Sequence, residues 1–167
     1  ALAESRELAP LAELVADTLN KRSLMMASAE SCTGGLVSAA ITDVSGSSAW
    51  FERGFVVYSN EAKSQMLGVP AALIREHGAV SEPVAHAMAE GAVLNSRAQV
   101  AVAITGVAGP TGGTPDKPVG MVCFGWSNRL QTRVETRHFK GDRKQVRLQA
   151  AEHALRGLLD FLDSAEC

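Results

Sequence analysis

Apolar and polar positions along the chain follow patterns that predict helices and strands in alternation. Residues 4 to 22 carry apolar side chains at helical spacing, with charged residues on the other faces, which predicts an amphipathic helix. The apolar run at residues 24 to 28 predicts a short buried strand. Helical spacing resumes at about residue 33 and continues to about residue 43. The chain therefore begins with a helix, a strand and a second helix.

The later segments continue this alternation. The expected strands are residues 50–59, 99–104, 119–126 and 132–139, and the expected helices are residues 61–67, 71–76, 81–97 and 142–163. The run at 99–104 is nearly all apolar, as in a parallel strand that is buried on both faces. The last two strands are close enough in sequence to form a hairpin. These elements predict an α/β sandwich, and the length of the chain fits one domain.

The turn after the first strand combines residues that suit a binding or catalytic site. Ser31 and Cys32 are nucleophile-type side chains, Thr33 is a residue type that caps helices, and Gly34 and Gly35 allow a ligand to approach the backbone. A strand-to-helix turn directs N–H groups toward a phosphate, a carboxylate or a developing oxyanion. The same residues also fit a turn that only caps a helix, because they match neither a P-loop nor a nucleophile elbow.

Two further strand ends carry polar residues. Tyr58 ends the second strand, and Lys63 lies in the helix that follows it. The third strand leads into a loop rich in glycine and threonine at residues 105–115, which is where an open α/β sheet binds ligands. A flexible surface connection would have a similar composition. The candidate ligand contacts in this loop are Thr105, Gly106, Thr111 and Gly112.

These turns suggest a nucleophile and a base. A serine hydroxyl attacks poorly near neutral pH until a neighbour takes its proton, and the four histidines lie outside all three turns. Lys63 would serve as the base if burial, or a cation such as Arg143 or Arg147 in the first turns of the last helix, lowered its pKa. Lys63 as a solvated helix residue remains the alternative. Its distance from Ser31 is not that of an S-x-x-K motif, so only the fold could join the two.

Charge and cysteine content narrow the class of protein. The 167 residues carry a formal net charge of -2, without the basic surface that binding to nucleic acid or to an anionic membrane usually requires. Cys32, Cys123 and Cys167 match no metal-binding or disulfide pattern, which indicates a reducing compartment and a cytoplasmic protein. No apolar run approaches the length of a membrane span, and the N-terminal residues do not resemble a secretory signal.

Four segments together resemble the CinA C-terminal domain family, and the similarity covers nearly the whole chain. They are residues 29–35 (AESCTGG), 54–63 (GFVVYSNEAK), 77–81 (HGAVS), and 103–106 with 109–113 (AITG and GPTGG). Four motifs in the right order and spacing are far more specific than any one of them. Val57 and Val107 stand where related chains vary, and this places no chemistry in doubt.

The resemblance implies a fold and an activity. The fold is a three-layer α/β/α sandwich with a mixed, mostly parallel sheet, formed here by residues 1–167 as the stand-alone form without the extra N-terminal domain of two-domain relatives. The activity is the hydrolysis of nicotinamide mononucleotide to nicotinate mononucleotide and ammonia, in pyridine nucleotide recycling. By this resemblance Ser31 is the nucleophile, Lys63 the base and Tyr58 a supporting residue.

The resemblance also implies the partners of the protein. No metal or cofactor is expected, and the partner is a small-molecule nucleotide rather than nucleic acid or a membrane. Relatives often associate, which leaves a homo-oligomer open. The expected substrate-binding residues are Thr33, Gly34, Gly35, Thr105, Gly106, Thr111, Gly112, Arg143 and Arg147.

Two other functions stay open at this point. The glycine- and threonine-rich turns alone would also fit a nucleotide-binding regulatory module without turnover. A cysteine hydrolase would instead use Cys32, since a thiol at the start of a helix has a lowered pKa. Cys32 has no partner histidine, however, and is expected to point away from Ser31 into the packing.

Overall fold

The computed structural model describes residues 2–165, and the side chains of residues 8–165, so that Cys167 lies outside the described residues. The helices are α1 (Leu2–Lys21), α2 (Leu36–Thr42), α3 (Asn60–Leu67), α4 (Ala71–His77), α5 (Glu82–Leu94) and α6 (Arg143–Ser164), with a short 3-10 turn, η1 (Ser47–Ala49). The strands are β1 (Met26–Glu30), β2 (Phe51–Val56), β3 (Val100–Gly106), β4 (Met121–Ser127) and β5 (Thr132–His138). Over the described range, no helix combines the length and the apolar character that crossing a bilayer requires.

The strands form one mixed sheet in the order β2-β1-β3-β4-β5. β1 pairs in parallel with both β2 and β3, and β4 is antiparallel to its two neighbours, so β5 again runs in the direction of the first three strands. After β1 the chain moves to the edge strand β2 and then returns past β1 to β3. The carboxyl ends of these three strands therefore meet at a topological switch point, the usual ligand-binding place in an open α/β sheet.

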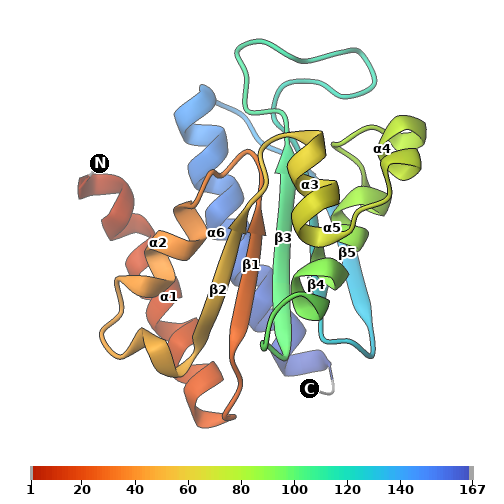
Figure 1. Cartoon of the computed structure of the whole chain (residues 1–167). Coiled ribbons are helices and arrows are strands. Elements are labelled where there is room, and N and C mark those ends of the chain that lie inside the picture. The colour runs from red at the N-terminus through yellow and green to blue at the C-terminus, as the bar shows by residue number, and fades with distance from the viewer. Residues whose placement is uncertain (1, 166–167) are drawn as a thin grey trace.

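Helices cover both faces of the sheet (Figure 1), and the predicted three-layer α/β/α sandwich is confirmed. α1, α2 and α6 lie on one face, and α3, α4 and α5 lie on the other. Successive strand side chains point to opposite faces, so Val100 and Val102 join the first core while Ala101 and Ala103 join the second. The small residues on the second face leave room for α5 to pack closely against β3 and β4.

α6 approaches β4 closely because it has a glycine at the point of contact. A Cβ atom on Gly157 would lie 2.0 Å from the ring of Trp126. The indole N–H of Trp126 donates to the carbonyl of Ala154 at 3.1 Å, and the ring stacks on Phe124 with 5.7 Å between the ring centroids. A larger residue at position 157 would hold the helix further from the strand.

The first strand-to-helix turn differs most from the prediction. β1 extends to Glu30, and α2 begins at Leu36 instead of about residue 33. Gly34 and Gly35 have φ values of 58° and 113°, in the left-handed region that a continuous right-handed helix excludes. Thr33 does not cap the helix, because its hydroxyl donates to the Glu30 carboxylate instead.

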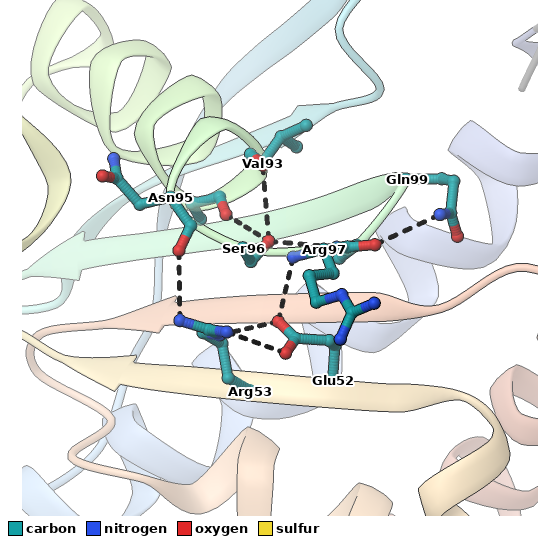
Figure 2. A network of polar contacts seen from close by, with 9 residues as sticks. Glu52, Arg53, Val93, Asn95, Ser96, Arg97 and Gln99 are labelled. Atoms are coloured by element: carbon teal, nitrogen blue, oxygen red, sulfur yellow. Dashed lines mark hydrogen bonds and ion pairs between the residues drawn. The ribbon is translucent and has the colours of Figure 1, made fainter.

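A network of polar contacts closes the opposite end of the sheet (Figure 2). Glu52 on β2 accepts a hydrogen bond from the backbone N–H of Arg97 at 3.1 Å, and also bonds Arg53 at 2.7 Å. Arg53 in turn donates to the carbonyl of Asn95 at 3.3 Å. The hydrogen bond from Arg53 lowers the pKa of Glu52 below its ordinary value. These contacts tie the edge strand to the loop that precedes β3.

Candidate active site

Ser31 is the first residue after β1, at the edge where the three parallel strands end. Its backbone N–H donates to the carbonyl of Ile104 on β3 at 3.0 Å, which continues the hydrogen bonding between the two strands by one residue. The residue is 7% exposed. The hydrogen bond to β3 therefore fixes the backbone of Ser31 at this end of the sheet.

Lys63 reaches Ser31 from the next strand-to-helix junction. It lies in α3, and the hydroxyl of Ser59 caps this helix by accepting a hydrogen bond from the N–H of Ala62. The Nζ atom of Lys63 lies 3.1 Å from Ser31 Oγ, within a hydrogen bond. It also donates to the carbonyls of Val57 and Tyr58, at 3.1 Å each. The fold thus joins two residues that are 32 positions apart in the sequence.

The surroundings of Lys63 favour its neutral form. The residue is 1% exposed, and burial lowers the pKa of its ammonium group below the ordinary value. Its three hydrogen-bond partners are a hydroxyl and two carbonyl oxygens, none of which carries a charge. A lysine in such a setting accepts a proton from a neighbouring hydroxyl more readily than a solvated lysine does.

Glu30 is buried directly beneath the turn, and sequence reasoning missed it. Its carboxylate, at 0% exposure, accepts hydrogen bonds from the Thr33 hydroxyl at 2.7 Å and from the Val37 N–H at 3.0 Å. It also accepts from the N–H of Ser38 at 3.1 Å and from the hydroxyl of Ser38 at 2.9 Å. The signal that could have revealed it is an acidic residue at the end of a buried strand, where a charge requires several donors.

Arg147 holds the same turn from above. From α6 its guanidinium donates to the carbonyl of Cys32 at 2.9 Å and to that of Thr33 at 3.2 Å. A Cβ atom on Gly34 would lie 3.2 Å from this guanidinium, so glycine allows the close approach. Arg147 was predicted to bind substrate. In the structure its guanidinium instead bonds backbone carbonyls of the turn that carries Ser31.

Tyr58 and Arg143 form the rim of the site. The Tyr58 side chain is 63% exposed, and its phenol oxygen accepts a hydrogen bond from Arg143 at 3.2 Å. Arg143 also donates to the carbonyl of Gly109, in the loop between β3 and β4, at 2.8 Å. Tyr58 contacts Lys63 through its backbone carbonyl, and its phenol group points to Arg143.

The last two residues of β3, Thr105 and Gly106, contact different parts of the structure. Gly106 lies next to the Ser31 turn, because a Cβ atom there would be 3.1 Å from the sulfur of Cys32. Thr105 is buried, and its hydroxyl donates to the carbonyl of Ala79 at 2.9 Å. Gly106 is thus beside the candidate nucleophile, whereas the side chain of Thr105 holds the segment between α4 and α5.

Thr111 and Gly112 lie further out, in the loop that rises above the sheet at the top of Figure 1. Both are exposed. The ammonium group of Lys117, in the same loop, donates to the carbonyl of His77 at the end of α4. The structure does not bring Thr111 and Gly112 into contact with Ser31, although the loop that carries them adjoins the site through Gly109.

Cys32 has the properties of a packing residue. It is buried, and burial raises the pKa of its thiol to about 12. The thiol therefore stays protonated near neutral pH and is a weak nucleophile there. This agrees with the expectation that Cys32 points into the packing.

Two large hollows in the surface can be compared as candidate substrate sites. One of about 560 Å³ lies between the β3–β4 loop and the start of α6, and includes Pro110 and Arg143. A larger one of about 720 Å³ lies between α5 and the α3–α4 segment, away from the residues predicted for the site. Of these two hollows, the one of about 560 Å³ is the better candidate for a substrate site, because Arg143 lines it and donates a hydrogen bond to Tyr58. Among the described side chains, no three His, Cys, Asp or Glu gather as a metal site would need.

Known proteins with similar sequences carry names of different kinds, among them nicotinamide-nucleotide amidohydrolase and competence-damage inducible protein. The chain is 52% identical, over 153 residues, to the nicotinamide-nucleotide amidohydrolase PncC of Escherichia coli K12, covering 91% of this chain and 93% of that protein. It is 54% identical over 166 residues to a putative competence-damage inducible protein of Symbiobacterium thermophilum, covering 92% of this chain. The matched part is 39% of that longer relative.

Solved structures agree with these relatives. The competence/damage inducible protein CihA from Agrobacterium tumefaciens superposes with a TM-score of 0.90 at 42% identity, over 94% of this chain and 96% of that one. ComA from Klebsiella pneumoniae gives a TM-score of 0.92 at 36% identity, over 95% of this chain and 99% of that one. The family model of the CinA C-terminal domain matches residues 8–162. The chain therefore belongs to the CinA C-terminal domain family.

Proposed function

We propose that this protein is a nicotinamide-nucleotide amidohydrolase that converts nicotinamide mononucleotide to nicotinate mononucleotide and ammonia. The observation that carries the proposal is the buried Lys63, with Nζ 3.1 Å from Ser31 Oγ. The name of the Escherichia coli relative, which this chain matches over nearly its whole length, supports the substrate. Pyridine nucleotide recycling in the cytoplasm is the physiological role that fits this reaction.

The partners of Lys63 suit a general base. A neutral amine has two protons and one lone pair, and the carbonyls of Val57 and Tyr58 accept two hydrogen bonds from Nζ. The lone pair is then free for the hydroxyl of Ser31, which donates to it. In this state Lys63 takes the Ser31 proton as Oγ attacks the carboxamide carbon.

The remaining steps balance the protons. The tetrahedral intermediate loses ammonia, which leaves with the proton that Lys63 took from Ser31. Water then attacks the acyl-enzyme, Lys63 accepts its proton, and Ser31 regains a proton as the acid is released. We propose that backbone N–H groups at residues 32–35 or 105–106 stabilise the oxyanion.

The rim of the site suits the nucleotide portion of the substrate. The exposed pair of Tyr58 and Arg143 combines an aromatic face with a cation, and the β3–β4 loop borders it. We propose that Arg143 binds an anionic or polar group of the substrate, with Tyr58 lining the opening. Arg147 acts indirectly, since its guanidinium bonds the carbonyls of the turn that carries Ser31.

The test is ammonia release from nicotinamide mononucleotide by the wild type and by Ser31→Ala. We expect Ser31→Ala to lose almost all activity, with its fold retained by circular dichroism, because one hydroxyl is removed. Cys32→Ala is the matched control, one residue further along the turn, and should keep most activity. An inactive Cys32→Ala beside an active Ser31→Ala would overturn the choice of nucleophile.

A nucleotide-binding regulatory module without turnover remains the second candidate, because a binding site alone would also use the rim residues. It predicts that nicotinamide mononucleotide binds the wild type in calorimetry while no ammonia appears. A lysine whose pKa is lowered by burial, beside a serine hydroxyl, favours the enzyme, since binding alone needs neither feature.

A further inference from the structure

We infer that Glu30 is a positioning residue for Ser31, and that its buried carboxylate sets the geometry of the nucleophile's turn. The inference rests on the proposed role of Ser31 as nucleophile. Glu30 immediately precedes Ser31 in the chain, so any movement of its backbone moves Ser31 as well. Its carboxylate is fully buried.

The four hydrogen bonds of this carboxylate connect the turn to the start of α2. One goes to the Thr33 hydroxyl within the turn, and the others go to the amides of Val37 and Ser38 and to the Ser38 hydroxyl, in the first turn of α2. All four donors are uncharged. Because a buried carboxylate is costly unless it is fully bonded, the turn has a strong preference for the one conformation that supplies all four donors.

The hydrogen bonds to Glu30 also determine which backbone N–H groups of the turn remain available to a substrate. The amides of Val37 and Ser38 are the N–H groups of the α2 start that a strand-to-helix turn would present to an anion. In this protein they face inward to Glu30. Between Ser31 and α2 the N–H of Gly34 donates to the carbonyl of Ser31 at 3.1 Å, so the donors left there for an oxyanion are those of Cys32, Thr33 and Gly35. The internal carboxylate thus occupies the place where the sequence suggested a bound anion.

Arg147 completes the restraint from the other side. It bonds the carbonyls of Cys32 and Thr33, while the hydroxyl of Thr33 bonds Glu30. The turn is therefore held between an internal anion and a half-buried cation that do not pair with each other directly. Ser31, at the start of this turn, takes its orientation toward Lys63 from both restraints.

The test compares Glu30→Gln with a matched control, Glu52→Gln. Both carboxylates accept hydrogen bonds from backbone N–H groups, but Glu52 lies at the opposite end of the sheet. In Glu30→Gln the side-chain amide presents N–H groups where two donors already point. We expect kcat per folded protein to fall about 100-fold, as for a nucleophile displaced by a fraction of an ångström to an ångström. KM should change less than about threefold, because the rim is unaltered.

Glu52→Gln should lower the melting temperature and leave kcat unchanged. A purely structural role for Glu30 predicts that its variant behaves in the same way, and an unchanged kcat in folded Glu30→Gln would overturn the inference. A fall in kcat for Glu52→Gln that matches the fall for Glu30→Gln would overturn it too, because general destabilisation would then explain both.

A second pair of variants keeps the inference testable if Glu30→Gln does not fold. Thr33→Val removes one donor to the carboxylate at nearly constant volume, and Thr33→Ser keeps that donor. We expect kcat to fall clearly further in Thr33→Val than in Thr33→Ser, whose hydroxyl can still donate to Glu30. Equal kcat values in the two variants would show that the bond to Glu30 does not position Ser31.

A readout that does not depend on the substrate separates this inference from the proposed function. A fluorophosphonate reacts with a nucleophilic serine, forming an Oγ–P bond while fluoride leaves. Slower labelling of Ser31 in Glu30→Gln, with wild-type labelling in Glu52→Gln, supports the positioning role even if the wild type releases no ammonia from nicotinamide mononucleotide. Unchanged labelling in folded Glu30→Gln overturns it even if that activity is present.

Discussion

At the scale of single residues, the burial of Lys63 is the feature that most supports the proposed chemistry. Transferring an ammonium group out of water is unfavourable, and Lys63 has only neutral partners to offset the loss. A protein that needed only a positive charge near Ser31 would keep it solvated or pair it with a carboxylate. The burial of Lys63 therefore supports its proposed role as the base, in which the neutral amine takes up the proton of Ser31.

The protonation of Lys63 gives a prediction about pH. The folded pKa lies below the ordinary value, and only the unprotonated amine accepts the Ser31 proton. Activity should therefore be lost as pH falls through the lowered pKa and should rise along one ionisation, which belongs to the Ser–Lys pair. The measurement is kcat/KM for nicotinamide mononucleotide across the pH range in which the enzyme stays folded.

Lys63→Arg checks the same assignment at fixed pH. Arginine keeps the charge and stays protonated at any accessible pH, so we expect turnover close to that of Ser31→Ala. Substantial ammonia release by Lys63→Arg would mean that the charge is what matters, and that Tyr58 or a water molecule accepts the proton.

At the scale of elements, the first turn of α6 joins three parts of the site. Arg143 connects α6 to Tyr58 after β2 and to Gly109 in the β3–β4 loop. These contacts lie at the rim, where the side chain of Arg143 is exposed and its loss leaves the core intact. The start of α6 is therefore expected to affect binding more than stability.

Arg143→Ala tests this expectation. We predict that KM rises about tenfold or more, as for the loss of a charge-assisted hydrogen bond, with a small change in kcat and in melting temperature. Arg156→Ala is the matched control, because this arginine lies on the same helix and pairs with Glu152 on the exposed surface. An equal KM for Arg143→Ala and Arg156→Ala would remove Arg143 from the substrate site.

The element pattern was largely readable from the sequence, and the details of the turn were not. Apolar periodicity identified the strands, and Ser59, Ser81 and Asp142 appear as helix caps in the structure. The start of α2 was predicted too early, because periodicity does not reveal that Gly34 and Gly35 adopt left-handed conformations. The sequence did not reveal the role of the Glu30 carboxylate for a related reason. Its hydrogen-bond donors come together only when the turn and α2 fold, and no sequence spacing indicates this.

The meeting of Ser31 and Lys63 also required more than local patterns. Each lies near a strand end that the sequence identifies, but their distance depends on β1 and β2 being neighbours. The family resemblance implies that Ser31 and Lys63 act together, which their spacing in the sequence does not. The contacts of Arg147 with the Ser31 turn had no such signal, because a basic residue in the first turns of a helix fits a surface position equally well.

At the scale of the whole molecule, the sheet order separates two ends with different contents. The carboxyl ends of β1, β2 and β3 carry the candidate catalytic residues, and the opposite end carries the Glu52 network that ties the edge strand in place (Figure 2). Mutations at the second end are therefore expected to alter stability independently of the chemistry, which is what makes Glu52 a suitable control.

The close contact between Gly157 and Trp126 also fixes the position of α6 relative to the sheet. Arg147 and Arg143 lie ten and fourteen residues before Gly157, which is roughly 15 and 21 Å at the rise of an α-helix. A rigid helix transmits displacement over that length, so a methyl group at position 157 acts on the rim without touching it. We expect Gly157→Ala to lower the melting temperature and to raise KM, and Gly157→Ala with Trp126→Phe to bring KM back toward the wild-type value. A KM that stays at the wild-type value in destabilised Gly157→Ala would show that the two ends of α6 are mechanically independent.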